Sequence, residues 1–351
     1  MKNIRIAFCL RRDYSQMPAG DIIQMERWQK ILLKLGCKVS VFSGDITEQE
    51  MREIDLAFIW HLERLHESLP FWNIARKMNK KIWLVPTCWS ANPHLSLFRI
   101  ISEEGKLLLR RIFSPSSFSC KTTVSNWKKN RQRLLDESDL LLVNSEAEKE
   151  FLKHQGALEE KIVVIPNTID AKELENVPQL PWEERSGIVH IGHFCPRKNQ
   201  IQLIKKLSGS DVHITFIGTW RPMHKLYHAR CLSLAGEQHN FLGKLPHKEL
   251  LKILGKSRLC ISSSTSETPG LSNLEAAVLG CNLILPDIAP IREYFGNDVN
   301  YMNPEKVDTE LIRLAAQTPP AEHLKKRILE NYTEKQTENI FINLFRSQKM
   351  Q

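Results

Sequence analysis

The sequence lacks the features that characterise membrane-spanning, secreted, disulfide-bonded and zinc-binding proteins. Its 351 residues contain no apolar run of the roughly 18 residues that a membrane-spanning helix needs. The apolar run at the N-terminus ends at Arg11, which predicts a first β-strand rather than a signal peptide. The eight cysteines include no C-x-x-C pair, so we expect buried free thiols in a reducing cytoplasm rather than disulfides or zinc sites.

Motifs of several enzyme classes are also missing. The sequence has no G-x-G-x-x-G dinucleotide fingerprint, no Walker A loop, no G-x-S-x-G elbow and no H-E-x-x-H helix. It therefore gives no support for a dinucleotide-dependent enzyme, a P-loop NTPase, an α/β-hydrolase or a zinc protease of these types.

What the sequence does have is a regular alternation of short apolar runs with longer amphipathic ones. Nearly continuous apolar strands are typical of a parallel sheet covered by helices on both faces. The length exceeds what a single core usually supports. We therefore predict an α/β fold with two doubly wound, parallel-sheet (Rossmann-like) domains facing a central cleft. The predicted strands are IRIAFCL, KVSVFSG, DLAFIW, KIWLVPT, DLLLVNS, KIVVIPN, GIVHIGH, DVHITFIG, NFLGKL, RLCISSS and CNLILPD.

The join between the two domains is predicted in the Pro-containing polar stretch 176–187. Residues 1–176 then form an N-terminal, acceptor-side domain and residues 177–326 a C-terminal, donor-binding domain. Residues 327–351 are expected to form a helix that packs back on the N-terminal domain. Its apolar stripe is Ile340, Phe341, Leu344 and Phe345.

The stretch SSSTSETPGLSNLEAAVLG contains two acidic residues with seven residues between them. Glu267 follows a predicted strand in a loop, and Glu275 lies in the helix that begins after the Pro-Gly turn. A loop of small residues that enters a helix offers backbone N–H groups to a phosphate or a sugar hydroxyl. The alternative is that Ser272 and Glu275 form only a capping box.

A basic pair follows another predicted strand, in VHIGHFCPRKNQ. Gly192 ends the strand, and His193, Arg197 and Lys198 precede the next helix. An arginine binds phosphate oxygens as a fork and a lysine neutralises them, so this pair is a candidate diphosphate clamp. A solvated basic loop is the alternative.

Three residues of the N-terminal half are acceptor-side candidates. Gly20 precedes Asp21, a plausible N-cap, so this loop can approach a ligand by its backbone. His61 and Trp89 each follow a predicted strand. Packing or capping is the alternative for both.

Taken in order, these motifs resemble the retaining glycosyltransferases of family 4, which have the GT-B fold. The strongest match is the Glu267-x7-Glu275 pair within S-x-x-E-x-x-G-L-x-x-L-E-A-x-x-x-G. The supporting matches are DLLLVNSEAEKEFL, KIVVIPNTID, IGHFCPRKN and FLGKLPHKELLKIL, and together they cover about residues 139–305.

The resemblance implies a role for each matched residue. Glu267 contacts the hydroxyls of the donor sugar, Glu275 binds the ribose, and Arg197 with Lys198 takes the diphosphate. Glu267, Lys198 and Arg197 are the implied catalytic residues, and no protein nucleophile is implied. The other implied donor-binding residues are Gly192, His193, Pro269, Gly270, Leu271 and Ser272. No metal or other cofactor is expected, because the basic pair and the helix terminus replace the metal.

The sequence departs from the family pattern at three places. His193 stands where the clamp loop usually has arginine, and Thr168 stands where a glycine is usual. Cys88-Trp89-Ser90 follows a strand after which many members carry a histidine, and His61 is a candidate replacement. These departures bear on catalysis more than on fold.

The resulting prediction is a cytoplasmic, metal-independent transferase that moves a sugar from a UDP- or GDP-sugar to a saccharide or lipid-linked acceptor, in surface polysaccharide biosynthesis. The segment Leu95–Arg133 carries nine basic residues against two acidic ones. It is a candidate for peripheral contact with an anionic membrane, an ordinary amphipathic helix being the alternative.

Other functions remain open at this point. One is a GT-B nucleotide-sugar epimerase, and another is a non-catalytic protein that binds a nucleotide sugar or carbohydrate. A nucleic-acid-binding module would draw on the net charge of +9, but no nucleic-acid motif accompanies it, and we expect no nucleic-acid partner.

Overall fold

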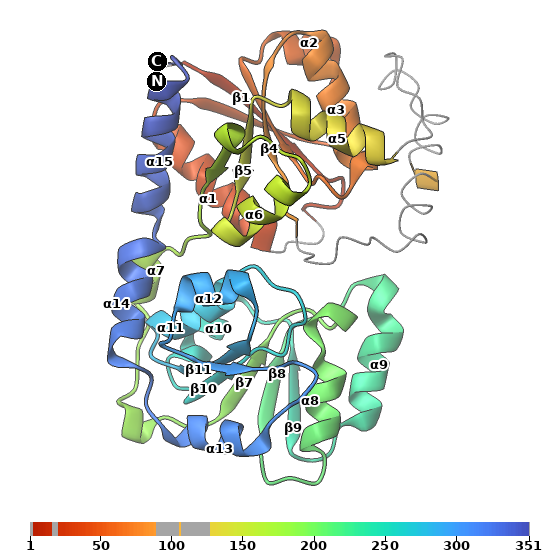
Figure 1. Ribbon diagram of the computed structural model, residues 1–351. Helices are drawn as coiled ribbons and strands as arrows, with labels where there is room; N and C mark the ends of the chain where they lie inside the picture. Colours follow the sequence, from red (N-terminus) through yellow and green to blue (C-terminus); the bar gives the residue numbers. More distant parts are fainter. Residues whose placement is uncertain (1–2, 16–19, 89–104, 107–126, 351) are drawn as a thin grey trace. The chain divides into compact units, whose positions relative to one another are not determined.

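The computed structural model describes residues 3–15, 20–88, 105–106 and 127–350 (Figure 1). The chain divides into two compact units. Unit 1 consists of Met1–Pro166 and Lys335–Gln351, and unit 2 consists of Asn167–Glu334. Unit 2 is thus a continuous segment inserted into unit 1.

Unit 1 is built on a parallel sheet with the strand order β2-β1-β3-β4-β5-β6. The strands are β1 (Arg5–Leu10), β2 (Lys38–Ser43), β3 (Leu56–Trp60), β4 (Lys81–Val85), β5 (Leu140–Val143) and β6 (Ile162–Val164). The described helices are α1 (Gly20–Lys34), α2 (Glu48–Arg52), α3 (Leu65–Lys77), α5 (Trp127–Glu137), α6 (Glu146–His154) and α15 (Glu334–Ser347).

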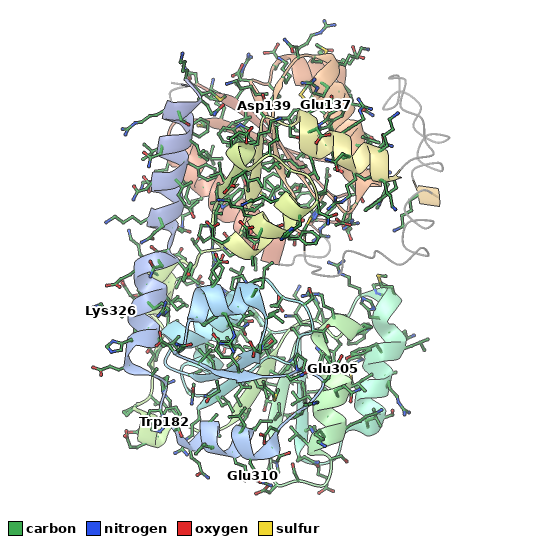
Figure 2. All side chains as sticks on the ribbon, in the orientation of Figure 1. Glu137, Asp139, Trp182, Glu305, Glu310 and Lys326 are labelled. Carbon is green, nitrogen blue, oxygen red and sulfur yellow. The ribbon has the colours of Figure 1, made fainter. Side chains whose placement is uncertain are left out.

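The central strands of unit 1 are apolar on both sides because both faces of the sheet are covered. In β1, Ala7 belongs to the core beneath α3 and α5, while its neighbour Phe8 belongs to the core beneath α1 and α15. Successive side chains of a strand point to opposite faces, so a buried parallel strand has no polar alternation. Asp139, labelled in Figure 2, accepts a hydrogen bond from the Ile82 N–H at 2.8 Å and so ties β5 to β4.

Helix α15 supplies part of the core of unit 1. Phe341 and Phe345 are fully buried. Phe341 lies edge-on to Trp28 of α1 with ring centroids 5.4 Å apart, and Phe345 lies 5.4 Å from Trp83 of β4. The apolar stripe expected in this tail therefore packs within the N-terminal unit.

Unit 2 is built on a second parallel sheet, with the order β12-β11-β10-β7-β8-β9. The strands are β7 (Ile188–Ile191), β8 (Ile214–Ile217), β9 (His239–Gly243), β10 (Leu259–Ile261), β11 (Asn282–Pro286) and β12 (Asn300–Met302). The helices are α7 (Ala171–Glu175), α8 (Gln200–Leu207), α9 (Lys225–Leu234), α10 (His247–Leu254), α11 (Leu271–Val278), α12 (Ala289–Phe295), α13 (Thr309–Gln317) and α14 (Glu322–Asn331).

The predicted fold class is confirmed, and each of the eleven predicted strands is present. The sequence did not predict β12, because Asn-Tyr-Met offers no apolar run to recognise. No helix among the described residues has the length and apolar character needed to cross a membrane.

The domain boundaries differ from those predicted. Unit 2 begins at Asn167 rather than at 177 and ends at Glu334 rather than at 326. The stretch 176–187 is not a free linker, because Leu180 N–H donates to Gly255 O at 2.9 Å and buried Arg185 donates to Ser257 O at 3.3 Å. Proline and polar side chains suggested a linker, but the backbone of this stretch packs against unit 2.

Candidate functional site

The strand order of each sheet marks one place where ligands bind most readily. In a doubly wound sheet this is the switch point, where the chain reverses direction across the sheet and neighbouring loops part. In unit 2 the switch point lies between the adjacent strands β7 and β10, and in unit 1 it lies between β1 and β3.

The loops that follow β7 and β10 are joined by hydrogen bonds at the switch point of unit 2. The Thr265 N–H donates to Arg197 O at 2.9 Å. The Ser263 hydroxyl donates to Lys198 O at 2.8 Å. The basic pair and the acid-containing loop, far apart in sequence, are therefore fixed side by side.

Glu267 lies at the centre of these loops with its side chain only 4% exposed. Lys198 Nζ donates to its Oε2, Arg197 Nη1 lies 3.4 Å from its Oε1, and the Ser264 hydroxyl donates to Oε2 at 3.0 Å. Burial would raise the pKa of Glu267, but the charges of Lys198 and Arg197 outweigh burial and hold the pKa below its ordinary value. Glu267 is therefore a carboxylate, able only to accept hydrogen bonds.

The site carries an excess of positive charge. Two cations, Arg197 and Lys198, face one carboxylate, Glu267. His190 lies beneath the loops with Nε2 3.3 Å from the Ser263 hydroxyl, and burial, followed by the charge of Lys198, lowers its pKa to about 3. Neutral His190 adds no charge, so the balance favours an anionic ligand.

Gly192 makes room for the lysine. Its φ is +152°, and a Cβ at this position would lie 3.1 Å from Lys198 Cε. The absence of a side chain at the end of β7 lets the stem of Lys198 pass over the backbone and reach Glu267. The position of Lys198 therefore depends on the glycine at 192. In the same loop, His193 O accepts a hydrogen bond from Gln200 Nε2 at 3.0 Å.

The turn before α11 needs a glycine. Gly270 is the N-cap residue with φ +73°, and Asn273 Nδ2 donates back to Pro269 O at 2.8 Å. A Cβ at Gly270 would lie 2.7 Å from Asn273 Nδ2. Leu271 and Ser272 are the first two helical residues, so the loop enters a helix as predicted.

Glu275 does not form the capping box with Ser272, since Ser272 already lies inside the helix. Glu275 is the fifth residue of α11, just beyond the first turn of the helix. Its Oε1 lies 3.1 Å from His247 Nε2, and His247 Nδ1 lies 3.3 Å from Glu173 Oε1. The hydrogen bond from Glu275 is the main cause that raises the pKa of His247.

His247 was not singled out from the sequence. The available signal was its place at the start of α10, directly after β9, within the supporting motif FLGKLPHKELLKIL. The pairing with Glu275 depends on the packing of α10 against α11, which the spacing of the two residues does not show.

In unit 1, His61 lies directly after β3 with φ +74°. Its Nδ1 lies 2.8 Å from the Thr87 hydroxyl and its Nε2 3.3 Å from Asp21 Oδ2. Asp21 is inside α1, which begins at Gly20, so it is not the N-cap residue that we predicted. Arg11 Nε donates to the same Asp21 oxygen at 3.1 Å.

The structure therefore brings His61 next to the first turn of α1, at Asp21, and adds Arg11, which the sequence had not indicated. Burial would raise the pKa of Asp21, but its charge contacts with His61 and Arg11, and its hydrogen bond from Arg11, lower it. Nδ1 of His61 has a hydrogen-bond partner in Thr87, whereas buried Nε2 has none among the described residues and only lies close to the Asp21 carboxylate.

Two predictions fall mainly outside the described residues. Trp89 is not among them, and neither is Ser90. Of the segment Leu95–Arg133, only residues 105–106 and 127–133 are described.

Comparisons with known proteins agree with this architecture. The family model described as "Glycosyl transferases group 1" matches residues 172–342, slightly under half of the chain and nearly all of unit 2. A comparison with the sequences of curated proteins gave no significant match.

Solved structures with a similar fold cover almost the whole chain. Sucrose-phosphate synthase from Thermosynechococcus elongatus is 13% identical with a TM-score of 0.72, covering 98% of both chains. HepE from Anabaena, solved in complex with UDP-glucose, is 14% identical with a TM-score of 0.69, covering 98% of this chain and 99% of its own. The lipopolysaccharide outer core galactosyltransferase WaaB is 14% identical with a TM-score of 0.62, covering 99% and 100%.

At these identities the likeness shows the fold. The protein has the GT-B fold, with two six-stranded parallel sheets. The sequence similarity to the glycosyl transferases of group 1 lies mainly in unit 2.

Proposed function

We propose that the protein is a retaining glycosyltransferase that transfers a sugar from a UDP- or GDP-sugar to a saccharide or lipid-linked acceptor in surface polysaccharide biosynthesis. The observation that carries the proposal is the grouping of Arg197, Lys198 and Glu267 at the switch point of unit 2. HepE was solved with UDP-glucose, which makes UDP-sugars the first donors to test.

The chemistry of the transfer fits this group. The bond that breaks joins the anomeric carbon to the diphosphate, and negative charge grows on the leaving nucleoside diphosphate. Arg197 and Lys198 would stabilise this charge, and the N-terminus of α11 would add its partial positive charge. Because the two cations and the N-terminus of α11 would together stabilise the charge of the diphosphate, we propose that the reaction needs no metal.

Glu267 would have two roles in this scheme. Without donor, it balances the charge of Lys198, which keeps the lysine extended across Gly192. With donor, the carboxylate would accept hydrogen bonds from sugar hydroxyls while the cations turn towards the phosphates. Glu275, held by His247, would accept from the ribose. We assign no nucleophile.

The first experiment measures thermal stabilisation by UDP-, GDP-, ADP- and CDP-sugars for the wild type, Lys198→Met and Glu267→Gln. Lys252→Met is the matched control, because Lys252 pairs with Glu249 at 2.8 Å on the exposed face of α10. We expect one nucleotide class to stabilise the wild type and the control but neither site variant. Stabilisation of all four proteins alike would contradict the assigned site.

A second experiment tests the reaction with the donor found. We expect the nucleotide to be released in the presence of acceptor, at a rate that EDTA does not change. We also expect the product to have the anomeric configuration of the donor. Release that requires a divalent metal would refute metal independence, and an inverted product would refute retention. Donor binding without release across many acceptors would indicate a binding protein, and sugar isomers without acceptor would indicate an epimerase.

A further inference from the structure

Helix α9 and the turn before it carry large apolar side chains in contact with water. Leu226 is 85% exposed and Met223 78% exposed, and Trp220 is 38% exposed. Of the eight exposed large hydrophobic residues in the described part of the chain, four lie between 220 and 232. Single exposed leucines are ordinary, but such clustering marks an interaction surface.

The charges of this region all have one sign. Arg221, Lys225 and Arg230 are basic, and no acidic residue occurs between Asp211 and Glu237. Lys225, Leu226 and Arg230 are all exposed on α9. We call Trp220, Arg221, Met223, Lys225, Leu226 and Arg230 the α9 surface. Helix α9 is labelled in Figure 1.

The fold of unit 2 does not require these outward apolar side chains. The inner side of α9 is anchored by buried Cys231 and by Tyr227, whose hydroxyl accepts from the Ile201 N–H at 3.2 Å. Trp220 stacks on His228 with ring centroids 3.9 Å apart, which fixes the turn against the helix. A helix held by its inner side normally presents a polar outer side, whereas α9 presents Leu226 and Leu232 there beside its basic residues.

We propose that the α9 surface rests on an anionic lipid bilayer. Leucine and methionine side chains insert into the boundary between headgroups and acyl chains, while basic side chains bind anionic headgroups. The absence of acidic residues removes the repulsion that such a membrane would otherwise exert. The proposal is independent of the donor site and of the segment Leu95–Arg133.

The test is flotation of the full-length protein with vesicles of phosphatidylcholine alone or mixed with an equal part of phosphatidylglycerol. We expect the wild type to float only with the anionic vesicles, and less at high salt. The double variant Met223→Ser with Leu226→Ser should partition at least about tenfold more weakly, from the apolar area it no longer buries. Lys225→Gln with Arg230→Gln should weaken partition by a similar factor, since each basic residue adds about 1 kcal/mol near such a membrane.

The matched control is Leu314→Ser. Leu314 is 63% exposed on α13, the helix that carries Glu310 in Figure 2. This variant should float like the wild type. Because all substituted side chains are exposed, unchanged melting temperatures will show that the variants are folded.

Three results would overturn the proposal. The first is a wild type that does not float with anionic vesicles. The second is an α9 double variant that floats as well as the Leu314→Ser control, which would assign membrane binding to another part of the chain. The third is self-association of the wild type, seen by size-exclusion chromatography and lost in the α9 variant, without vesicle binding, which would make the surface a protein interface.

Discussion

The two switch points of the molecule use charge in opposite ways. In unit 1, Arg11 is buried between two carboxylates, with Nη1 2.6 Å from Asp13 and Nε 3.1 Å from Asp21. In unit 2, Glu267 is buried between two cations. In the first arrangement the carboxylates outnumber the cations, since Arg64, 3.7 Å from Asp13, is itself paired with Glu67. In the second arrangement the cations outnumber the carboxylate.

Under the proposed function, this difference would let one fold, used twice, serve two tasks. An excess of positive charge at a crevice attracts a diphosphate, whereas an excess of negative charge repels one and suits neutral hydroxyls. The sheet order determines where each site lies, and the few side chains after the central strands determine what it binds.

The largest effect is expected from Lys198→Met, which leaves Glu267 buried without its closest cation. The free energy of unfolding should fall by about 4 kcal/mol, within the range for breaking a buried ion pair. Stabilisation by UDP should disappear as well. Urea denaturation with and without UDP measures both effects.

The double variant Lys198→Met with Glu267→Gln separates stability from binding. With neither charge buried, most of the lost free energy of unfolding should return, while UDP should still have no effect. A double variant as unstable as the single one would show that Lys198 stabilises the loop by packing and not by its charge.

The next largest effect is expected in unit 1, from Arg11→Met. Asp21 keeps its contact with His61, and Asp13 is partly exposed, so the free energy of unfolding should fall by about 3 kcal/mol. The stabilisation by UDP should stay as in the wild type. If UDP no longer stabilised Arg11→Met, the proposed division of tasks between the two switch points would be contradicted.

A smaller effect is expected from Gly270→Ala. An alanine at φ +73° is strained, and its Cβ would also lie 2.7 Å from Asn273 Nδ2, so we expect a loss of about 2 kcal/mol. Gly209→Ala is the matched control, because Gly209 has φ +78° with no atom near the position of a Cβ. The control should lose about 1 kcal/mol. Equal losses in urea denaturation would show that the contact with Asn273 does not matter.

The smallest effect is expected at His247. Glu275 raises the pKa of His247 above its ordinary value of 6.5, so the protonated ring stabilises the fold. This contribution is complete below the ordinary pKa and is lost as the pH rises through the folded-state pKa. His247 is 40% exposed, so screening keeps the contribution below about 1 kcal/mol.

His247→Gln should therefore be less stable than the wild type at about pH 6, and the gap should be smaller at about pH 8.5, because the ring loses its proton as the pH rises through its folded-state pKa. Urea denaturation at the two pH values measures the difference. A gap between the two proteins that is constant with pH would mean that His247 acts through packing alone.

The fold could be predicted because each strand and helix is indicated by a short, continuous stretch of the sequence. Runs such as KIWLVPT identify buried strands by composition, and their alternation with amphipathic segments defines a doubly wound sheet. Residues that follow strands must gather at one edge of the sheet, so Glu267, Arg197 and Lys198 were found as separate motifs. Their direct contact is the part that the structure adds.

The rest depends on contacts between segments distant in sequence. Arg11 lies only ten residues from Asp21, but the pairing requires β1 and α1 to be packed together. His247 and Glu275 meet because α10 lies beside α11. The domain boundary was misplaced because prolines mark a linker and a packed turn equally well.

Helix α15 also has a consequence for how the protein forms in the cell. Trp28 and Trp83 of unit 1 lack their aromatic contacts with α15 until Phe341 and Phe345 have been synthesised and have left the ribosome. Unit 2 is an uninterrupted segment, whereas unit 1 needs residues from both sides of it, so the core of unit 1 cannot be completed before unit 2 has been synthesised. Chains cut short after unit 2 would lack Phe341 and Phe345, so the aromatic side chains around Trp28 and Trp83 would be exposed to chaperones and proteases.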